Sequence, residues 1–239
     1  MVNRATRSTA QIRIGTSGYS YSWNQRRPTP FKWYLSQGFN SVEINATFYR
    51  FPPESWLKAW TEAPRDFSFS IKVHRSITHY TRLRVRSYDL WPRFERSLEP
   101  IEGKIDFWLF QMPADFKSSD KNLEVIRDFL HRANLHNKAV VEFRDISWWK
   151  KIEQIASMGA VFCSVDAPDL PHELIVTNGA IYLRMHGSPK WYSSVYPEKV
   201  LENKLHQIKE LEANMKAIFL NNDHGMLSNG LYLMSRIYS

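Results

Sequence analysis

Eight short apolar segments recur along this chain, and each ends in a small group of polar residues. They end at Thr16-Ser17, Glu43-Ile44-Asn45, Lys72-Val73-His74, Gln111, Glu142-Phe143-Arg144, Asp166, Arg184-Met185-His186 and Asn221-Asn222-Asp223-His224. Parallel strands that carry polar groups at one common end are typical of a barrel whose site lies at that end. A length of 239 residues also matches eight strand–helix pairs. We therefore expect an α/β fold, a single (β/α)8 TIM-type barrel.

Strand and helix patterns alternate without a linker-like segment, which predicts one domain over residues 12–239. Residues 1–11 are polar and basic, and we expect them to form a disordered tail. The connection between the sixth and seventh strands, residues 167–179, is short and proline-rich, so no crossover helix is expected there. Apolar residues at helical spacing predict a long helix over residues 197–216.

Composition narrows the setting in which the protein works. No apolar run approaches the ~20 residues that a membrane-spanning helix needs. The polar N-terminus lacks the apolar segment of a secretory signal. Cys163 is the only cysteine, which excludes an internal disulfide and a zinc site built from thiolates. We expect a cytoplasmic protein without a membrane partner.

The net charge of +8 is concentrated in part of the chain, because residues 1–42 and 67–88 contain no acidic residue. The second stretch contains Lys72, Arg75, Arg82, Arg84 and Arg86. A localised basic face favours a phosphate-rich partner, since neutralising phosphates releases counterions. The expected partner is an anionic small molecule or a nucleic acid. The alternative is a basic surface that serves only solubility.

Period-two alternation assigns side chains to the two faces of each strand. The residues assigned to the barrel interior are Glu43, Asn45, Lys72, Glu142, Arg144, Arg184 and His186. On the sixth strand the same reasoning turns Asp166 inward and Cys163 outward. Charged residues inside a barrel are costly unless they are paired or used, so their gathering at one end predicts a shared site.

Carboxylates, fixed cations and imidazoles at one end predict acid–base chemistry on a phosphate-bearing substrate. Such an enzyme would be a hydrolase, an isomerase or a lyase. The candidate catalytic residues are Glu43, Glu142, His186 and Lys72. The candidate substrate-binding residues are Thr16, Ser17, Asn45, Tyr49, Arg75, His79, Gln111, Arg144, Asp166, Arg184, Asn221 and Asn222.

Three other interpretations remain open. The first is a divalent-metal site for phosphodiester or sugar chemistry, with ligands from Glu43, Glu142, Asp166, His186 and Asp223 and a further candidate in His224. The second is a buried salt-bridge network that only holds the barrel together. The third is a non-catalytic module that binds nucleic acid through a basic rim of Arg75, Arg82, Arg84 and Arg86. The sequence identifies no cofactor and specifies no oligomeric state.

Two loop features add to this picture. The segment Gly15-Thr16-Ser17-Gly18 could offer backbone amides and hydroxyls to an oxyanion. Aromatic residues also gather where loops leave the strands, and they either seal the core or stack on bases or sugars. These residues are Tyr19, Tyr21, Trp23, Phe48, Tyr49, Trp148, Trp149, Trp191 and Tyr192.

Six ordered motifs carry a family resemblance. They are Gly15–Tyr21, Glu43–Tyr49, Ile77-Thr78-His79 with Arg82-Leu83, Glu142-Phe143-Arg144, Tyr182–Gly187 and Asn221–Gly225. As a set, from about Ile12 to the C-terminus, they resemble the domain-of-unknown-function 72 family, also called YecE-like. The resemblance implies a TIM-type barrel with a groove lined by these motifs. It implies no established activity, substrate or metal.

Overall fold

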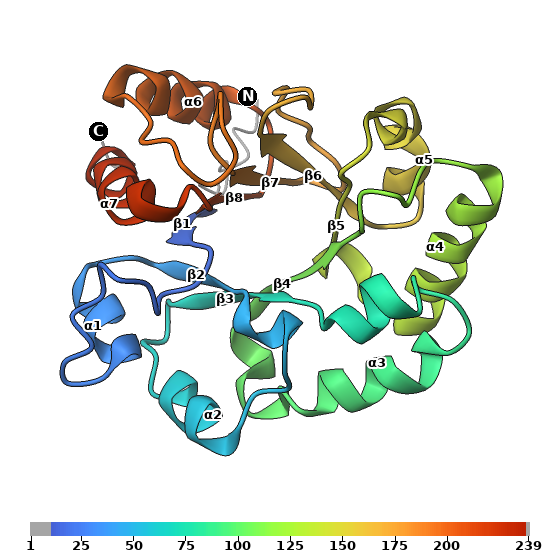
Figure 1. Ribbon diagram of the computed structural model, residues 1–239, viewed down its shortest axis with the longest axis horizontal. Coiled ribbons are helices and arrows are strands. Elements are labelled where there is room, and N and C mark those ends of the chain that lie inside the picture. The colour runs from blue at the N-terminus through green and yellow to red at the C-terminus, as the bar shows by residue number, and fades with distance from the viewer. Residues whose placement is uncertain (1–10, 238–239) are drawn as a thin grey trace, which may run out of the picture.

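A ring of parallel strands forms the centre of the computed structural model, which describes residues 11–237 (Figure 1). The strands are β1 (Gln11–Thr16), β2 (Ser41–Ile44), β3 (Ser68–Lys72), β4 (Ile105–Gln111), β5 (Ala139–Glu142), β6 (Val161–Asp166), β7 (Ala180–Met185) and β8 (Met215–Leu220). They pair in the order β1-β8-β7-β6-β5-β4-β3-β2. The expected single (β/α)8 TIM-type barrel is confirmed. Of the predicted tail, residues 1–10 lie outside the described residues, and Gln11 already belongs to β1.

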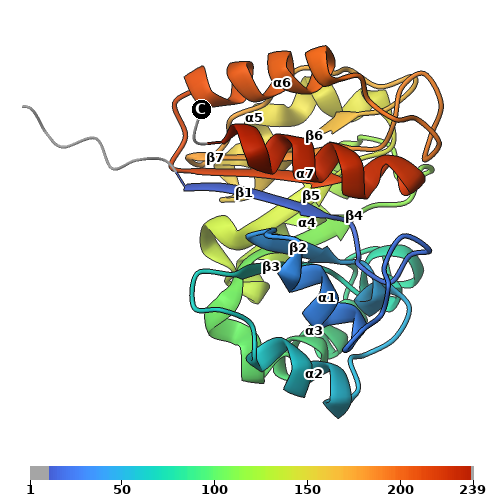
Figure 2. The same ribbon diagram turned by 90° about the vertical axis from the view of Figure 1, so that its left-hand side faces the viewer.

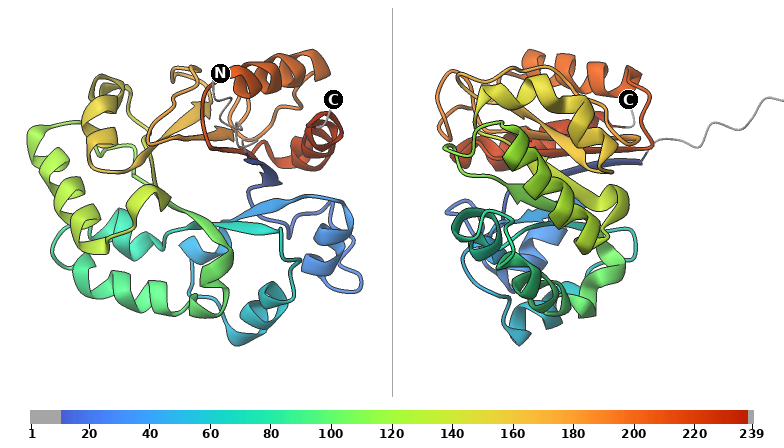
Figure 3. Two further views of the ribbon diagram at one scale, coloured as in Figure 1. Left: turned by 180° about the vertical axis from the view of Figure 1, so that it is seen from behind. Right: turned by 90° about the vertical axis from the view of Figure 1, so that its right-hand side faces the viewer.

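Helices surround the strands on all sides, as both faces of the ring show (Figures 1 and 3). They are α1 (Pro30–Ser36), α2 (Glu54–Thr61), α3 (Ser87–Arg96), α4 (Asp120–Ala133), α5 (Ile152–Ser157), α6 (Glu198–Glu210) and α7 (Met226–Arg236). The connection 167–179 contains no helix, as expected. No helix between residues 11 and 237 is long and apolar enough to cross a membrane.

The helix predicted over 197–216 extends six residues too far at its C-terminal end. Helix α6 ends at Glu210, and Leu211 has extended backbone angles of φ −68° and ψ 139°. The amide of Asn214 then donates to the carbonyl of Gly179 at 2.7 Å, which starts the pairing of β8 with β7. Strand pairing in the barrel therefore overrides the local helical pattern here.

The seam between β1 and β2 is closed mainly by side chains. Only Ser17 and Glu43 form a backbone bridge across it within the described chain. The Asn40 side chain accepts from the amide of Ile14 at 2.8 Å, and the Tyr34 hydroxyl donates to the carbonyl of Ser41 at 2.9 Å. Figure 2 shows β1 between α7 and the β2–α1 layer. These side chains replace backbone bonds that a closed barrel would otherwise need.

The middle of the barrel is a layer of buried, mostly apolar side chains. It contains Phe107, Leu109, Val140, Val161, Cys163, Val165, Ala180, Tyr182, Ala217 and Phe219. The inward positions of Cys163 and Val165 show that the face assignment of the sixth strand was wrong. Strand β6 is buried on both faces, so its sequence has no polar alternation from which a face can be read.

Candidate functional site

Arg184 is the centre of a buried ionic network at the C-terminal end of the barrel. Its Nε and Nη2 donate to the two carboxylate oxygens of Glu43 at 2.9 and 2.6 Å, and its Nη1 donates to Glu142 at 2.6 Å. The hydroxyl of Tyr182 also donates to Glu43, at 2.7 Å. Glu43, Glu142 and Arg184 are all 0% exposed. One arginine on β7 thus joins carboxylates from β2 and β5.

Glu142 has three cationic or imidazole neighbours. Besides Arg184, the Nε of Arg144 lies 2.9 Å from its Oε1, and the Nε2 of His186 lies 2.9 Å from the same oxygen. Burial alone would raise the pKa of Glu142, but the charges of Arg144 and Arg184, with the hydrogen bond from His186, outweigh it and hold that pKa well below 4.5. Glu142 is therefore a carboxylate at neutral pH.

His186 is a neutral imidazole held between two partners. The side-chain amide of Asn221 donates to its Nδ1 at 2.8 Å, which leaves the ring proton on Nε2, facing Glu142. Burial and the charge of Arg184 lower the pKa of His186 to about 3. Asn221 thus selects the tautomer of His186, which in turn orients the Glu142 carboxylate.

Lys72, at the end of β3, lies above this network. Among the described residues its ammonium group has no ion-pair partner, and its Nζ sits 4.4 Å from the centre of the Phe48 ring. Burial, followed by the positive charge of Arg184, lowers the pKa of Lys72 to about 7. An amine with this pKa populates both protonation states at neutral pH.

Lys72 lines a cavity of about 270 Å³, which we call the charged cavity. Its walls are Tyr21, Asn45, Tyr49, Lys72, Tyr192, Asn221, Asp223 and Met226. Arg144, whose side chain is 13% exposed, donates to the Tyr192 hydroxyl at 3.2 Å and lies 4.7 Å from the Trp191 ring centre. Lys72 thus lines the charged cavity and Arg144 contacts its wall through Tyr192, whereas Glu43 and Glu142 are fully buried.

Three further candidate residues contact or neighbour residues of this site, but none of them lines the charged cavity. The ring of His79 packs edge-on against Phe48 at 4.8 Å, and burial together with the charge of Lys72 lowers the pKa of His79 to about 4. The guanidinium of Arg75 lies 5.9 Å from the Tyr49 ring. Gln111 ends β4 beside Glu142 in the strand register.

Two candidate residues lie away from this site. Asp166 faces outward, where its carboxylate accepts from the Tyr196 hydroxyl at 2.8 Å. Asn222 donates to the carbonyl of Ser194 at 2.6 Å and to Asn229 at 2.8 Å, so it anchors the segment after β7. The structure therefore places both side chains in hydrogen bonds outside the barrel interior, and neither lines the two cavities of this end.

The glycine-rich loop after β1 does not present free amides to a ligand. The amide of Thr16 donates to the Tyr34 hydroxyl at 3.0 Å, and that of Ser17 donates to the carbonyl of Leu220 at 2.8 Å. The amide of Gly18 donates to the carbonyl of Glu43 at 2.7 Å. The oxyanion role predicted for these amides is therefore incorrect, since closure of the barrel uses all three.

The proposed metal ligands are not brought together. Glu43, Glu142 and His186 are bound within the arginine network, while Asp166 points outward. Asp223 lines the charged cavity, and its Oδ2 lies 3.6 Å from the Nε2 of His224. Residues 11–237 contain no group of three or more histidine, cysteine, aspartate or glutamate side chains arranged to hold a metal ion. The five residues of the alternative metal site thus do not form one cluster in the described part of the chain.

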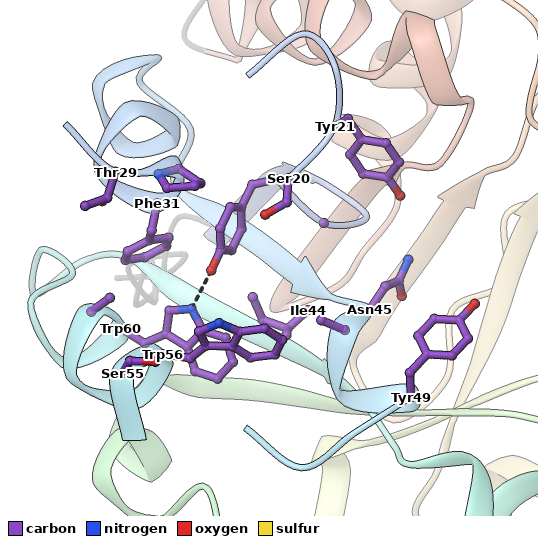
Figure 4. Close-up of a pocket in the computed structure, with 15 residues that line it drawn as sticks. Ser20, Tyr21, Thr29, Phe31, Ile44, Asn45, Tyr49, Ser55, Trp56 and Trp60 are labelled. Carbon is purple, nitrogen blue, oxygen red and sulfur yellow. Dashed lines mark hydrogen bonds between the residues drawn. The ribbon is translucent and has the colours of Figure 1, made fainter. Parts of the chain in front are cut away.

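A second cavity, of about 500 Å³, adjoins the first and was missed from the sequence. We call it the aromatic cavity (Figure 4). It lies between α2 and the loop after β1, and its walls are Gly18, Tyr19, Ser20, Tyr21, Thr29, Pro30, Phe31, Ile44, Asn45, Ala46, Tyr49, Ser55, Trp56, Ala59 and Trp60. Trp56 and Trp60 carry a helical spacing that indicates packing against the core, so the pattern gave no sign of a cavity.

A family model for proteins of unknown function, DUF72, matches residues 13–234. The chain belongs to the DUF72 family. The resemblance seen in the sequence motifs is thereby confirmed. A comparison with curated proteins gave no significant match.

Solved structures support the same assignment. A DUF72 family protein from Thermotoga maritima MSB8 is 26% identical, with a TM-score of 0.85 over 96% of this chain and 100% of that chain. One from Enterococcus faecalis V583 is 19% identical, with a TM-score of 0.81 over 96% and 98%. The endoglucanase Cel5A of Pseudomonas stutzeri, 8% identical with a TM-score of 0.51 over 93% of each chain, shares the fold alone.

Proposed function

We propose that this DUF72 protein is an enzyme that performs acid–base chemistry on a phosphate-bearing substrate in the charged cavity. Lys72 would transfer the proton, and Arg144 would hold the anion. The observation that carries the proposal is the position of Lys72. Its amine lines the charged cavity and has no ion-pair partner in the described chain, whereas the nearby carboxylates of Glu43 and Glu142 are already paired with Arg184.

The buried network supports this division of roles. Glu43 and Glu142 were candidate catalytic residues, but each is fully buried and bound to Arg184. In this arrangement they position the cations of the cavity rather than reach a substrate. Because the pKa of Lys72 is lowered to about 7, its neutral form can accept a proton and its ammonium form can return it.

The test uses sulfate, whose charge stays constant between pH 5 and 9. Calorimetry should detect sulfate binding at pH 6 that weakens at least tenfold by pH 8.5, because Lys72 loses its proton. Lys72→Met should weaken sulfate binding at pH 6 at least tenfold, because one of the two cations is lost, and should remove its pH dependence, whereas Lys58→Met, on the exposed surface of α2, should change neither. Binding that is unaffected by Lys72→Met would refute the proposal.

A second function, binding of single-stranded nucleic acid, is favoured by one surface feature. Arg75 lies 5.9 Å from the ring of Tyr49 and 5.6 Å from that of Tyr80, and these tyrosines are 63% and 69% exposed. Exposed aromatic rings beside an arginine are suited to stacking on bases. Changing Tyr80, which lines neither cavity, to alanine should weaken oligonucleotide binding while leaving sulfate binding intact. Equal oligonucleotide binding by this variant would rule out the stacking surface.

A further inference from the structure

Six aromatic residues form most of the side-chain wall of the aromatic cavity, namely Tyr19, Tyr21, Phe31, Tyr49, Trp56 and Trp60. Trp60 donates its indole N–H to the Tyr19 hydroxyl at 2.9 Å, so both polar atoms are satisfied within the wall. The rings of Trp56 and Trp60 lie 5.8 Å apart, and the guanidinium of Arg50 sits 4.2 Å from the Trp56 ring centre. A volume of about 500 Å³ lies within the range of small-molecule sites. Such walls suit a flat apolar ring.

The aromatic cavity and the charged cavity share a wall. Tyr21, Asn45 and Tyr49 line both of them. In Figure 4 these three residues lie at one end of the aromatic cavity, and Phe31, Trp56 and Trp60 lie at the other. A molecule that reaches across this wall would place one end among aromatic rings and the other beside Lys72.

The shared wall carries an unused hydrogen-bond acceptor. Asn45 donates its amide N–H to the carbonyl of Ser17 at 3.2 Å, which fixes the orientation of the amide. Its Oδ1 is buried and has no partner in the described part of the chain. A buried acceptor without a partner is costly, so a small rotation of the Asn45 side chain that opens this oxygen to a ligand donor would remove that cost.

We infer that the aromatic cavity binds a flat aromatic ring of the substrate, and that the substrate is a small molecule joining this ring to an anionic group. The inference rests on the proposed function, because the anion occupies the charged cavity. It adds the chemical class of the substrate: a one- or two-ring aromatic group with an N–H or O–H donor near the junction, linked to a phosphate or similar anion.

Three probes separate the two ends of such a substrate in calorimetry at pH 6. (1-Naphthylmethyl)phosphonate carries the ring and the anion and cannot be hydrolysed at a P–O ester bond. 1-Naphthol carries the ring alone, and sulfate carries the anion alone. The phosphonate should bind at least tenfold more tightly than either of the other two.

Variants of α2 locate the ring. Ala59→Phe places a bulky side chain in the aromatic cavity. It should weaken the binding of naphthol and of the phosphonate at least tenfold while leaving the binding of sulfate unchanged. Lys58→Phe puts the same side chain on the neighbouring exposed position, outside both cavities, and should change none of the three. Ser55→Phe, at an exposed position on the cavity wall, gives a second occluding variant should Ala59→Phe fold poorly.

The outcomes distinguish the inference from the proposed function. Sulfate binding that depends on Lys72, together with naphthol that fails to bind, would overturn the inference and leave the proposed function standing. If naphthol binds and Ala59→Phe removes this binding, but sulfate does not bind, the ring site is supported and the proposed anion site is overturned. Naphthol binding that is equal in Ala59→Phe, Ser55→Phe and Lys58→Phe would place the ring elsewhere and overturn the inference.

Discussion

Arg184 and Glu43, on strands β7 and β2, meet through two parallel hydrogen bonds of 2.9 and 2.6 Å. Both side chains are completely buried, and a third bond from Arg184 reaches Glu142. A buried bidentate pair of this kind has fixed geometry, and the loss of one partner leaves the other charge uncompensated. The pair therefore ties β7 to β2 across the barrel.

The first prediction concerns Glu43. Glu43→Gln removes the charge that faces Arg184 and one of the acceptors used by Tyr182, so we expect a loss of about 3–5 kcal/mol in the free energy of unfolding. Urea denaturation followed by circular dichroism measures it. Glu153→Gln, an exposed change on α5, is the control and should be within about 0.5 kcal/mol of wild type. A stability of Glu43→Gln equal to that of the control would show that the pair does not hold the barrel.

The second prediction is a pH dependence at Glu142. Its pKa in the folded protein is held well below 4.5 by neighbouring positive charges, which outweigh burial. The stability that ionised Glu142 contributes is therefore complete above about pH 4.5 and is lost as the pH falls toward the folded pKa. Glu142→Gln should cost about 3–5 kcal/mol at pH 7 and less at pH 3.5. A difference from wild type that is constant between these pH values would contradict the assignment.

The third prediction concerns Lys72, whose pKa is lowered to about 7 from 10.5, chiefly by burial and then by the charge of Arg184. Between pH 7 and 10.5 the unfolded chain binds this proton more strongly than the folded one, so wild-type stability rises with pH relative to a variant without the amine. Lys72→Met should raise the melting temperature most at pH 6 and least near pH 10. Lys58→Met serves as the exposed control and should show no such trend. If Lys72→Met changes the melting temperature equally at both pH values, burial of the Lys72 ammonium does not destabilise the folded protein.

The fourth prediction tests the seam between β1 and β2. A Cβ added at Gly15 would lie 2.2 Å from the carbonyl oxygen of Ser41 and 3.2 Å from the Tyr34 hydroxyl. Gly15→Ala must therefore push the two strands apart and should cost about 1–3 kcal/mol or more. Gly103→Ala, where nothing lies within 4 Å of the added atom, is the matched control. Thermal melting that is identical for the two variants would show that the seam can open without cost.

Much of the barrel could be predicted because its signals are local. Polar residues after apolar segments placed the strand ends, and alternation on β7 correctly turned Arg184 and His186 inward. The same alternation placed Glu43 and Glu142 on the interior side, where Arg184 binds both. These results follow from a two-residue period that survives wherever one face of a strand is polar.

The sequence alone determined the barrel class, the missing crossover helix, the family and the end of the barrel that carries the polar groups. Only the tertiary structure decided that Asp166 and Asn222 point away from the site, that Arg184 neutralises the two glutamates, and that Lys72 is left without an ion-pair partner in the described chain. Periodicity assigns a side chain to a face, but it does not say which other strand supplies the partner. That choice depends on closure of the barrel, which brings side chains such as Glu43 and Arg184 to within 3 Å although 141 residues separate them.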